Sequence, residues 1–171
     1  MLYIGIDPGK GGGVVALTPL GIHSVSVFGS MTELATWQLF RGFKQFDDCI
    51  AVIEKIPSIT FNKGRNNSAS NIAELYGHYR AIRMAMCGAG ISYSESRPQD
   101  WQKYHGIESR RKTETDTAWK KRLMFNARKL FPRINMSLAV SDAYLIAEYC
   151  RRVHKRVNQN AEDRNQNDYD T

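Results

Sequence analysis

The sequence lacks any long hydrophobic run. Hydrophobic residues make up 42% of the 171 residues and charged residues 24%, and no apolar stretch approaches the roughly 20 residues that a membrane-spanning helix needs. The N-terminus, MLYIGIDPGK, has neither the basic start nor the long apolar stretch of a signal peptide. We therefore expect a globular protein that stays in the cytoplasm.

Cysteine and histidine are too few and too scattered to form a cluster. Three cysteines, an odd number set far apart in apolar surroundings, exclude a disulfide framework and a zinc spacing; they are Cys49, Cys87 and Cys150. The four histidines show no ligand spacing and are interpreted as structural or surface residues; they are His23, His78, His105 and His154.

Positive charge outweighs negative charge, with a formal net charge of +7. The segment 158–171 is rich in Asn, Gln and Asp and holds four acids against one base, so the rest of the chain is near +10. A charge of this size favours a polyanionic partner, although many basic proteins bind none. We predict one domain over 1–157, followed by a disordered polar tail over 158–171.

The hydrophobic pattern predicts an α/β fold, a mixed five-stranded sheet flanked by helices. Short apolar runs bounded by turn residues predict strands at Leu2–Asp7, Gly13–Thr18, Ile22–Phe28, Cys49–Glu54 and Ile91–Glu95. The first three follow one another closely, which indicates an antiparallel meander. Helical spacing predicts helices at Thr32–Phe43, Ser70–Met86, Pro98–Trp101, about Thr117–Leu130 and about Val140–Val157. The polar segment Pro57–Ser68 is expected to be a loop.

Three acidic residues stand where these elements begin or end. Asp7 closes the first predicted strand and Glu54 the fourth. If the two strands pair in parallel, their ends lie about 4.8 Å apart, close enough for two carboxylates to share metal ions. Asp142 lies in the first turn of the last helix, on the side of its buried stripe. Three acids that face the interior need a cation.

Each acid also has a purely structural interpretation. Asp7 precedes Pro-Gly and could be a turn former, and Asp142 could interact with the positive end of its helix. Glu54 is harder to explain in this way, because a carboxylate at the end of an apolar run is costly to bury without a partner.

The motifs around these acids resemble a known family. GIDPGKGGGVVAL, AVIEK and SDAYLIAEYCRR, in this order, resemble the RuvC-type Holliday junction resolvases of the RNase H-like superfamily. FNKG, RPQDWQK and KLFP are similar to a phage and prophage branch of that family, and the resemblance covers about Met1 to Arg152. It implies an RNase H-like fold, a homodimer, and metal-dependent cleavage of four-way DNA junctions in a bacterial or phage-infected cytoplasm.

The positions that match the family's catalytic acids are Asp7, Glu54 and Asp142. We expect them to hold two Mg²⁺ ions, which Mn²⁺ could replace, with Asp7 shared between the two. One departure stands out: cellular members carry a fourth acidic or histidine ligand one helical turn before the last acid, and here that position is Ala139. Water or Ser141 would then complete the ligand shell.

Basic and aromatic residues near these acids are candidate DNA contacts. The loop after Glu54 holds an aromatic that could wedge into the junction or pack back into the core, together with two bases; these are Phe61, Lys63 and Arg65. The stretch 97–133 holds eleven Lys or Arg against four acids, and its candidate phosphate contacts are Lys112, Lys120, Lys121 and Arg122. Lys120 matches a basic position in the family.

Three other functions remain open at this stage. One is a flap or replication-fork debranching nuclease on the same fold, and another is a non-catalytic protein that binds branched DNA. The third is a sugar-kinase-like ATPase, which also begins with a strand, Asp and glycines; the length of 171 residues argues against it, because two such domains clamp the nucleotide.

Overall fold

The computed structural model describes residues 1–56 and 69–167. Its centre is a five-stranded sheet of order β3-β2-β1-β4-β5. The strands are β1 (Leu2–Asp7), β2 (Gly13–Leu17), β3 (Ile22–Val27), β4 (Cys49–Glu54) and β5 (Ser92–Ser96). The first three pair antiparallel as a meander, whereas β4 runs parallel to both β1 and β5. The predicted mixed sheet is confirmed.

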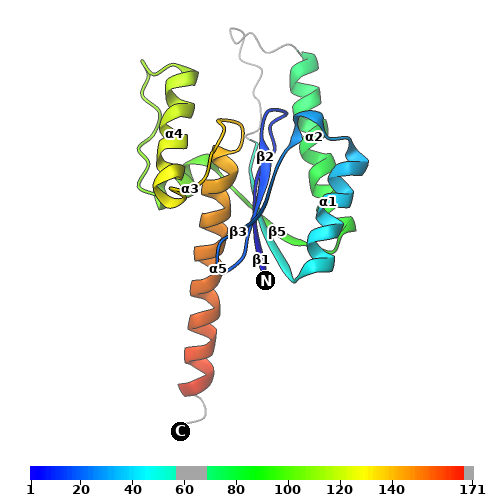
Figure 1. The fold of residues 1–171 in the computed structure, drawn as a ribbon, viewed down its shortest axis with the longest axis vertical. Helices are drawn as coiled ribbons and strands as arrows, with labels where there is room; N and C mark the ends of the chain where they lie inside the picture. The colour runs from blue at the N-terminus through cyan, green and yellow to red at the C-terminus, as the bar shows by residue number, and fades with distance from the viewer. Residues whose placement is uncertain (57–68, 168–171) are drawn as a thin grey trace.

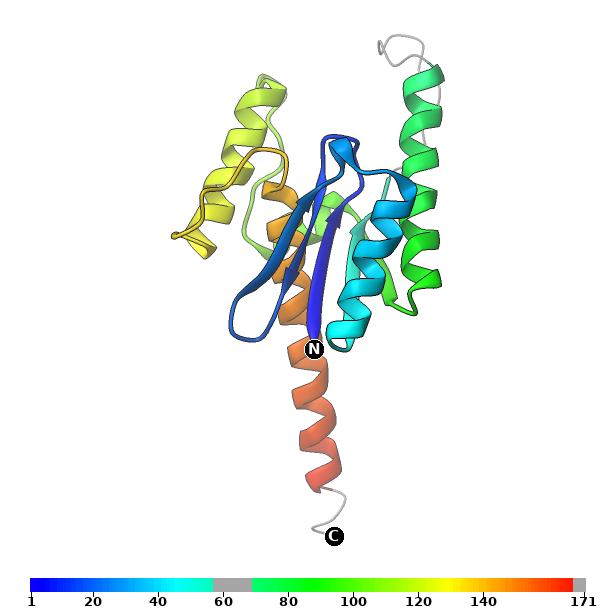
Figure 2. The same cartoon turned by 45° about the vertical axis from the view of Figure 1, so that its right-hand side comes forward.

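Helices cover both faces of this sheet. They are the short 3-10 helix η1 (Phe28–Ser30), α1 (Glu33–Phe46), α2 (Ala69–Gly88), α3 (Pro98–Tyr104), α4 (Asp116–Leu130) and α5 (Ser141–Asn167). Figure 1 shows α1 and α2 on one face and α5 on the other, with α3 and α4 outside α5; Figure 2 shows the same layers after a 45° turn. Among the described residues no helix is both long and apolar enough to cross a bilayer.

Alternation along β1 builds two separate cores. Leu2, Ile4 and Ile6 are fully buried on the side of α1 and α2, whereas Tyr3 packs on the other side among residues of α5. Successive side chains of a strand point to opposite faces, so a strand covered on both faces is apolar throughout. Each fully buried Leu or Ile stabilises the fold by roughly 1.5–3 kcal/mol.

Gly5 brings α5 into direct contact with β1. A Cβ at this position would lie 2.0 Å from the backbone nitrogen of Ala147 and 2.4 Å from the carbonyl oxygen of Ala143. Only glycine permits the helix backbone to approach the strand so closely. Because Gly5 lies two residues before Asp7 and Ala143 directly follows Asp142, this contact also brings the two acids to the same edge of the sheet.

The predicted helices begin close to where the structure has them. Thr32 caps α1 by accepting a hydrogen bond from the backbone N–H of Ala35 at 3.2 Å, and Pro98 begins α3. The end of the chain differs from the expectation, since α5 continues as a helix to Asn167 instead of giving way to a disordered tail at 158. Residues 158–167 contain no Gly or Pro to end the helix. The predicted loop Pro57–Ser68 lies outside the described residues.

Candidate active site

Asp7 ends β1 at the edge of the sheet where the parallel strands terminate. Its side chain is 14% exposed, and its Oδ1 accepts a hydrogen bond from the backbone N–H of Gly9 at 3.1 Å. The turn that follows closes tightly over it, because a Cβ on Gly12 would lie 2.4 Å from the carbonyl oxygen of Asp7. The DPGKGG segment therefore holds this carboxylate in one position.

Glu54 lies beside Asp7 because β1 and β4 are parallel neighbours. The register pairs Ile6 with Ile53, which sets the next residue of each strand at the same edge. The indole Nε1 of Trp101, a fully buried residue of α3, donates a hydrogen bond to Glu54 Oε2 at 3.0 Å. The parallel pairing on which the predicted juxtaposition depended is confirmed.

Asp142 reaches the same edge from the first turn of α5. Its side chain is 8% exposed, and its Oδ1 accepts a hydrogen bond from the hydroxyl of Ser141 at 3.1 Å. The amino-terminal end of a helix favours a negative charge. The hydroxyl of Ser141 is within hydrogen-bonding distance of Asp142 Oδ1 and of the carbonyl oxygen of Leu138, so Ser141 supports the carboxylate. The methyl side chain of Ala139 has no atom that could bind a metal ion.

The three carboxylates disfavour one another's charge. Burial raises the pKa of Glu54 to about 8, with the charges of Asp7 and Asp142 adding to the shift. The pKa of Asp7 is also raised, first by burial and then by the charge of Asp142. The charge of Asp142 acts on both Asp7 and Glu54, and that of Asp7 acts on Glu54, so the three side chains lie close together. Titratable groups with strongly perturbed pKa values gather at functional sites.

One cation, Lys120 of α4, lies among the acids. Its Nζ is 2.5 Å from Asp142 Oδ2 and 3.8 Å from Asp7 Oδ2. Burial by itself lowers the pKa of Lys120, but the charges of Asp142 and Asp7 outweigh it and the pKa is raised. Lys120, which is predicted to contact a phosphate, thus lies inside the site beside the acids.

The chemistry of the donor set fits Mg²⁺. All three acids offer carboxylate oxygens, the ligands that hard divalent cations prefer, and burial leaves their negative charge in need of a cation. In the described part of the chain, no three His, Cys, Asp or Glu side chains are arranged to hold one ion as the structure stands. The ammonium of Lys120 lies between two of the acids instead.

The other predicted DNA contacts differ in their surroundings. Lys112 and Lys121 are exposed. Arg122 binds Glu114 with two hydrogen bonds, of 3.0 and 2.7 Å, and also donates to the carbonyl oxygen of Glu108. It therefore fastens the loop before α4, and its donors are not directed at a ligand. Phe61, Lys63 and Arg65 lie outside the described residues.

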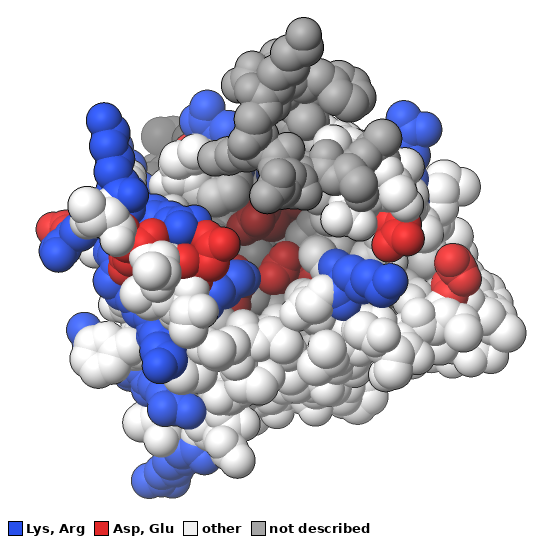
Figure 3. Space-filling view, turned by 90° about the horizontal axis from the view of Figure 1, so that it is seen from above, with Lys and Arg blue, Asp and Glu red and all other residues white. Residues whose placement is uncertain are grey.

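Charge is distributed unevenly around the site. Figure 3 looks down on this edge of the sheet: acidic side chains lie inside a hollow, and Lys and Arg gather on the side formed by α4 and the loop before it. A polyanion that approaches this face would meet the bases of that side before it reached the acids.

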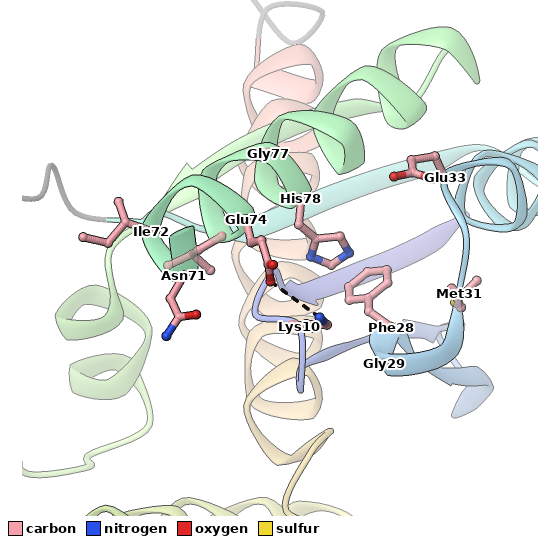
Figure 4. Close-up of a pocket in the computed structure, with 11 residues that line it drawn as sticks. Lys10, Phe28, Gly29, Met31, Glu33, Asn71, Ile72, Glu74, Gly77 and His78 are labelled. Carbon is pink, nitrogen blue, oxygen red and sulfur yellow. Dashed lines mark ion pairs between the residues drawn. The ribbon is translucent and has the colours of Figure 1, made fainter. Parts of the chain in front are cut away.

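A separate cavity of about 670 Å³ lies behind the turn that carries Asp7 (Figure 4). Phe28 and Met31 contribute apolar surface, and Lys10 faces Glu74, whose Oε2 is 3.5 Å from its Nζ. Its lining holds two carboxylates, Glu33 and Glu74, against this one lysine. This balance of charge does not suit a phosphate group.

Residues that support the acids were not identified from the sequence. The ring of His78 on α2 lies with Nδ1 2.8 Å from the carbonyl oxygen of Pro8, directly after Asp7. Trp101 binds Glu54 across 47 positions of sequence. A tryptophan in an amphipathic segment, or a single histidine, is common in any core, so neither carries a signal that a single sequence reveals.

Comparison with known proteins identifies the fold. No protein-family model matches the chain, and no curated protein matches it. Among solved structures, RuvC from Thermus thermophilus superimposes with a TM-score of 0.53 at 17% identity, over 86% of this chain and 91% of that one. Thermus thermophilus RuvC in complex with a Holliday junction substrate superimposes with a TM-score of 0.54 at 16% identity, over 86% and 90%.

The chain therefore has an RNase H-like fold. Within that class its arrangement of sheet and helices is that of RuvC.

Proposed function

We propose that this chain is a metal-dependent endonuclease that resolves Holliday junctions and other branched DNA, and that it is related to the phage and prophage branch of the RuvC-type resolvases. The observation that carries the proposal is the meeting of Asp7, Glu54 and Asp142, from β1, β4 and α5, in one buried cluster of coupled charge. The RuvC-like fold and the basic side formed by α4 support it. The activity would serve recombination and repair, or genome processing.

The acids would hold the metal, and each has a definite role. Asp7, fixed by the turn that closes over it, would be shared between two ions, with Glu54 on one and Asp142 on the other. When bound there, Mg²⁺, or Mn²⁺ in its place, would supply the activation of water and the stabilisation of the leaving oxygen that phosphodiester hydrolysis requires. Trp101 orients Glu54 and Ser141 orients Asp142 by the hydrogen bonds described above, which keeps both carboxylates directed into the cluster.

The DNA would lie across the basic side. Lys112 and Lys121 are exposed there and would contact phosphates away from the cut, while Lys120 is close enough to the acids to contact the scissile phosphate itself. Phe61, Lys63 and Arg65 keep the role proposed for them, contact with the junction beside the cut. Arg122 is assigned the structural role that its pairing with Glu114 indicates.

Two symmetric cuts across a junction need two active sites, so we propose a homodimer with a twofold axis. The outer side of α2 offers exposed residues for such an interface: Gly77, Arg80 and Met84, the last 70% exposed. Tyr79 is 6% exposed and belongs to the core between α2 and the sheet.

Cleavage of a panel of substrates tests the proposal. Equal amounts of a four-way junction, a flap, a fork and a duplex are labelled and incubated with the protein, with Mg²⁺ or with a chelator. We expect Mg²⁺-dependent symmetric nicks in the junction and much slower cutting of the duplex. Preferential cutting of the flap or fork would identify a debranching nuclease, and junction binding without any nick would identify a non-catalytic binding protein.

A further inference from the structure

Lys120 occupies the position where the proposed function requires a metal ion. Its ammonium lies between Asp142, at 2.5 Å, and Asp7, at 3.8 Å. Both carboxylates come from distant parts of the chain, and both are largely buried, with side chains 8% and 14% exposed. An ammonium has three donors and a full positive charge, which suits it to the oxygens that a divalent cation would bind.

The two adjacent lysines of α4, Lys120 and Lys121, differ in their surroundings. Lys121 follows on the same helix and is exposed. Lys120 lies instead on the side of α4 that faces α5, where Leu123 and Ala127 of the same helix are buried. The side chain of Lys120 is 40% exposed, so solvent reaches part of it. It can leave the acids without any change in the backbone, because that stem is long and flexible.

Without a cation, Asp7 and Asp142 would oppose each other. Two buried carboxylates repel in a medium of low dielectric constant, and each loses the water that would otherwise stabilise its charge. The ion pairs of Lys120 compensate for both effects. A divalent cation would provide the same compensation with twice the charge and at the same oxygens.

We propose that Lys120 is the built-in counter-ion of the metal-free site, and that a divalent cation displaces it from Asp7 and Asp142. The inference rests on the proposed function for the metal site alone and not for the reaction. Because ammonium and metal compete for the same oxygens, each weakens the binding of the other, as linkage requires. Lys120 would keep the empty site assembled, and its release would free a cation for the DNA phosphate.

Acetylation of the unmodified protein tests the displacement directly. The protein is treated briefly with acetic anhydride, with a chelator or with saturating Mg²⁺, in the absence of DNA, and modification is read by mass spectrometry. Lys121 is the internal control. Because the ion pairs with Asp142 and Asp7 hold the Nζ of Lys120 away from the reagent, we expect the Lys120-to-Lys121 ratio to rise about tenfold with Mg²⁺, a typical size for coupled sites. A ratio that stays constant or falls overturns the proposal.

A substitution provides the second test. In Lys120→Met the competitor is removed, so the affinity for Mg²⁺, measured by calorimetry without DNA, should rise by about tenfold, a typical size for coupled sites. Lys121→Met is the matched control and should bind Mg²⁺ as the unmodified protein does. Unchanged or weaker binding by Lys120→Met would contradict the proposal.

These measurements separate the inference from the proposed function. If Mg²⁺ releases Lys120 but the protein cuts no branched DNA, the counter-ion proposal stands and the proposed nuclease activity is refuted. If the protein cuts junctions but Mg²⁺ leaves the reactivity of Lys120 unchanged, the proposed nuclease activity stands and the counter-ion proposal is refuted.

Discussion

The acids of the site are destabilising in the absence of metal. Glu54 is buried beside two other carboxylates, and its pKa of about 8 means that it takes up a proton when the protein folds near neutral pH. The pKa of Asp7 is shifted in the same direction. Natural sites often carry such a cost where function needs the charge, and removal of the charge then increases stability while activity is lost.

The substitution Glu54→Gln tests this cost through its pH dependence. Between pH 4.5 and about 8 the folded protein holds a proton on Glu54 that the unfolded chain has lost, so the free energy of unfolding falls as pH rises through this range. Gln can still accept the hydrogen bond from Trp101. We expect Glu54→Gln to be more stable than the unmodified protein by roughly 4 kcal/mol at pH 8.5 and by less than about 1 kcal/mol at pH 5, in urea unfolding with a chelator present.

The exposed residue Glu33 provides the control for that measurement. Glu33→Gln, a substitution on the surface, should change the free energy of unfolding by at most about 0.5 kcal/mol. Glu54→Gln and the unmodified protein could differ in free energy of unfolding by the same amount at pH 5 and at pH 8.5. That result would contradict the cost assigned to the buried charge of Glu54.

Gly5 is the residue on which the assembly of the site most depends. In Gly5→Ala the new Cβ would lie 2.0 Å from the backbone of α5, so the helix must move away from β1. We expect a loss of about 3 kcal/mol in the free energy of unfolding, and weaker Mg²⁺ binding because Asp142 moves with the helix. Gly11→Ala, whose Cβ would meet nothing within 4 Å, should have little effect; equal losses for the two would refute the close contact.

At this scale the sequence reveals the acids but not their surroundings. Asp7 and Glu54 both close apolar runs. Glu54 has few structural explanations at such a position, whereas Asp7 before Pro-Gly could also have been a turn former. The pairing of Asp142 with Lys120 could not be predicted. Lys120 is one of eleven bases in the stretch 97–133, and only the packing of α4 on α5 places this one beside Asp142. The role of Gly5 was hidden for the same reason.

Among the elements, the loop between α3 and α4 depends most on a single side chain. Arg122 reaches from α4 to Glu114 and to the backbone at Glu108 and Ser109, while its guanidinium lies 4.5 Å from the ring of Trp119. The planar guanidinium can make these contacts at once, whereas a lysine ammonium is a point charge. The basic loop is thereby fastened beside the site.

Arg122→Lys should release this loop while the rest of the fold remains intact. We expect trypsin to nick the segment 110–112 roughly tenfold faster, because local opening controls such cleavage and the lost contacts are worth about 1.4 kcal/mol. Lys121→Arg, on the adjacent exposed position, should leave the rate unchanged. If Arg122→Lys is cut no faster than the unmodified protein, the assigned role of Arg122 is wrong.

Most helices and strands could be predicted, because the spacing of the hydrophobic residues and the capping residues indicate the same bounds. The strand at Cys49–Glu54 and the cap at Thr32 are examples. The end of α5 could not be predicted from composition: polarity suggested a disordered tail over 158–171, yet the helix continues to Asn167. Polar residues without Gly or Pro are compatible with either outcome, and a single sequence does not decide between them.

For the whole molecule, the excess of positive charge becomes meaningful only through its position. The order of strands and helices was sufficient to predict a mixed sheet flanked by helices, whereas the RNase H-like form of that sheet was what the resemblance to the RuvC-type resolvases implied. The net charge of +7 by itself favoured a polyanionic partner but gave no location for it. The structure gathers bases along α4 and the loop before it, next to the acidic hollow.

Salt dependence of junction binding tests that arrangement. We expect Lys112→Ala combined with Lys121→Ala to weaken binding to all junction sequences alike, and to reduce the slope of log affinity against log salt by about 2, because each lost phosphate contact removes about 0.9. Lys44→Ala is the control, since Lys44 belongs to α1 on the other face of the sheet and pairs with Asp48. Equal slopes for the double variant and the unmodified protein would place the DNA elsewhere.

The most direct test of the central claim is junction cleavage by Asp7→Asn. Asn keeps the size of the side chain and an oxygen that can accept the hydrogen bond from Gly9, but it removes the charge that the metal needs. With Mg²⁺ present we expect binding of a four-way junction within about twofold of the unmodified protein and cleavage reduced at least about a thousandfold. Cleavage at the unmodified rate by a folded, junction-binding Asp7→Asn would contradict the account.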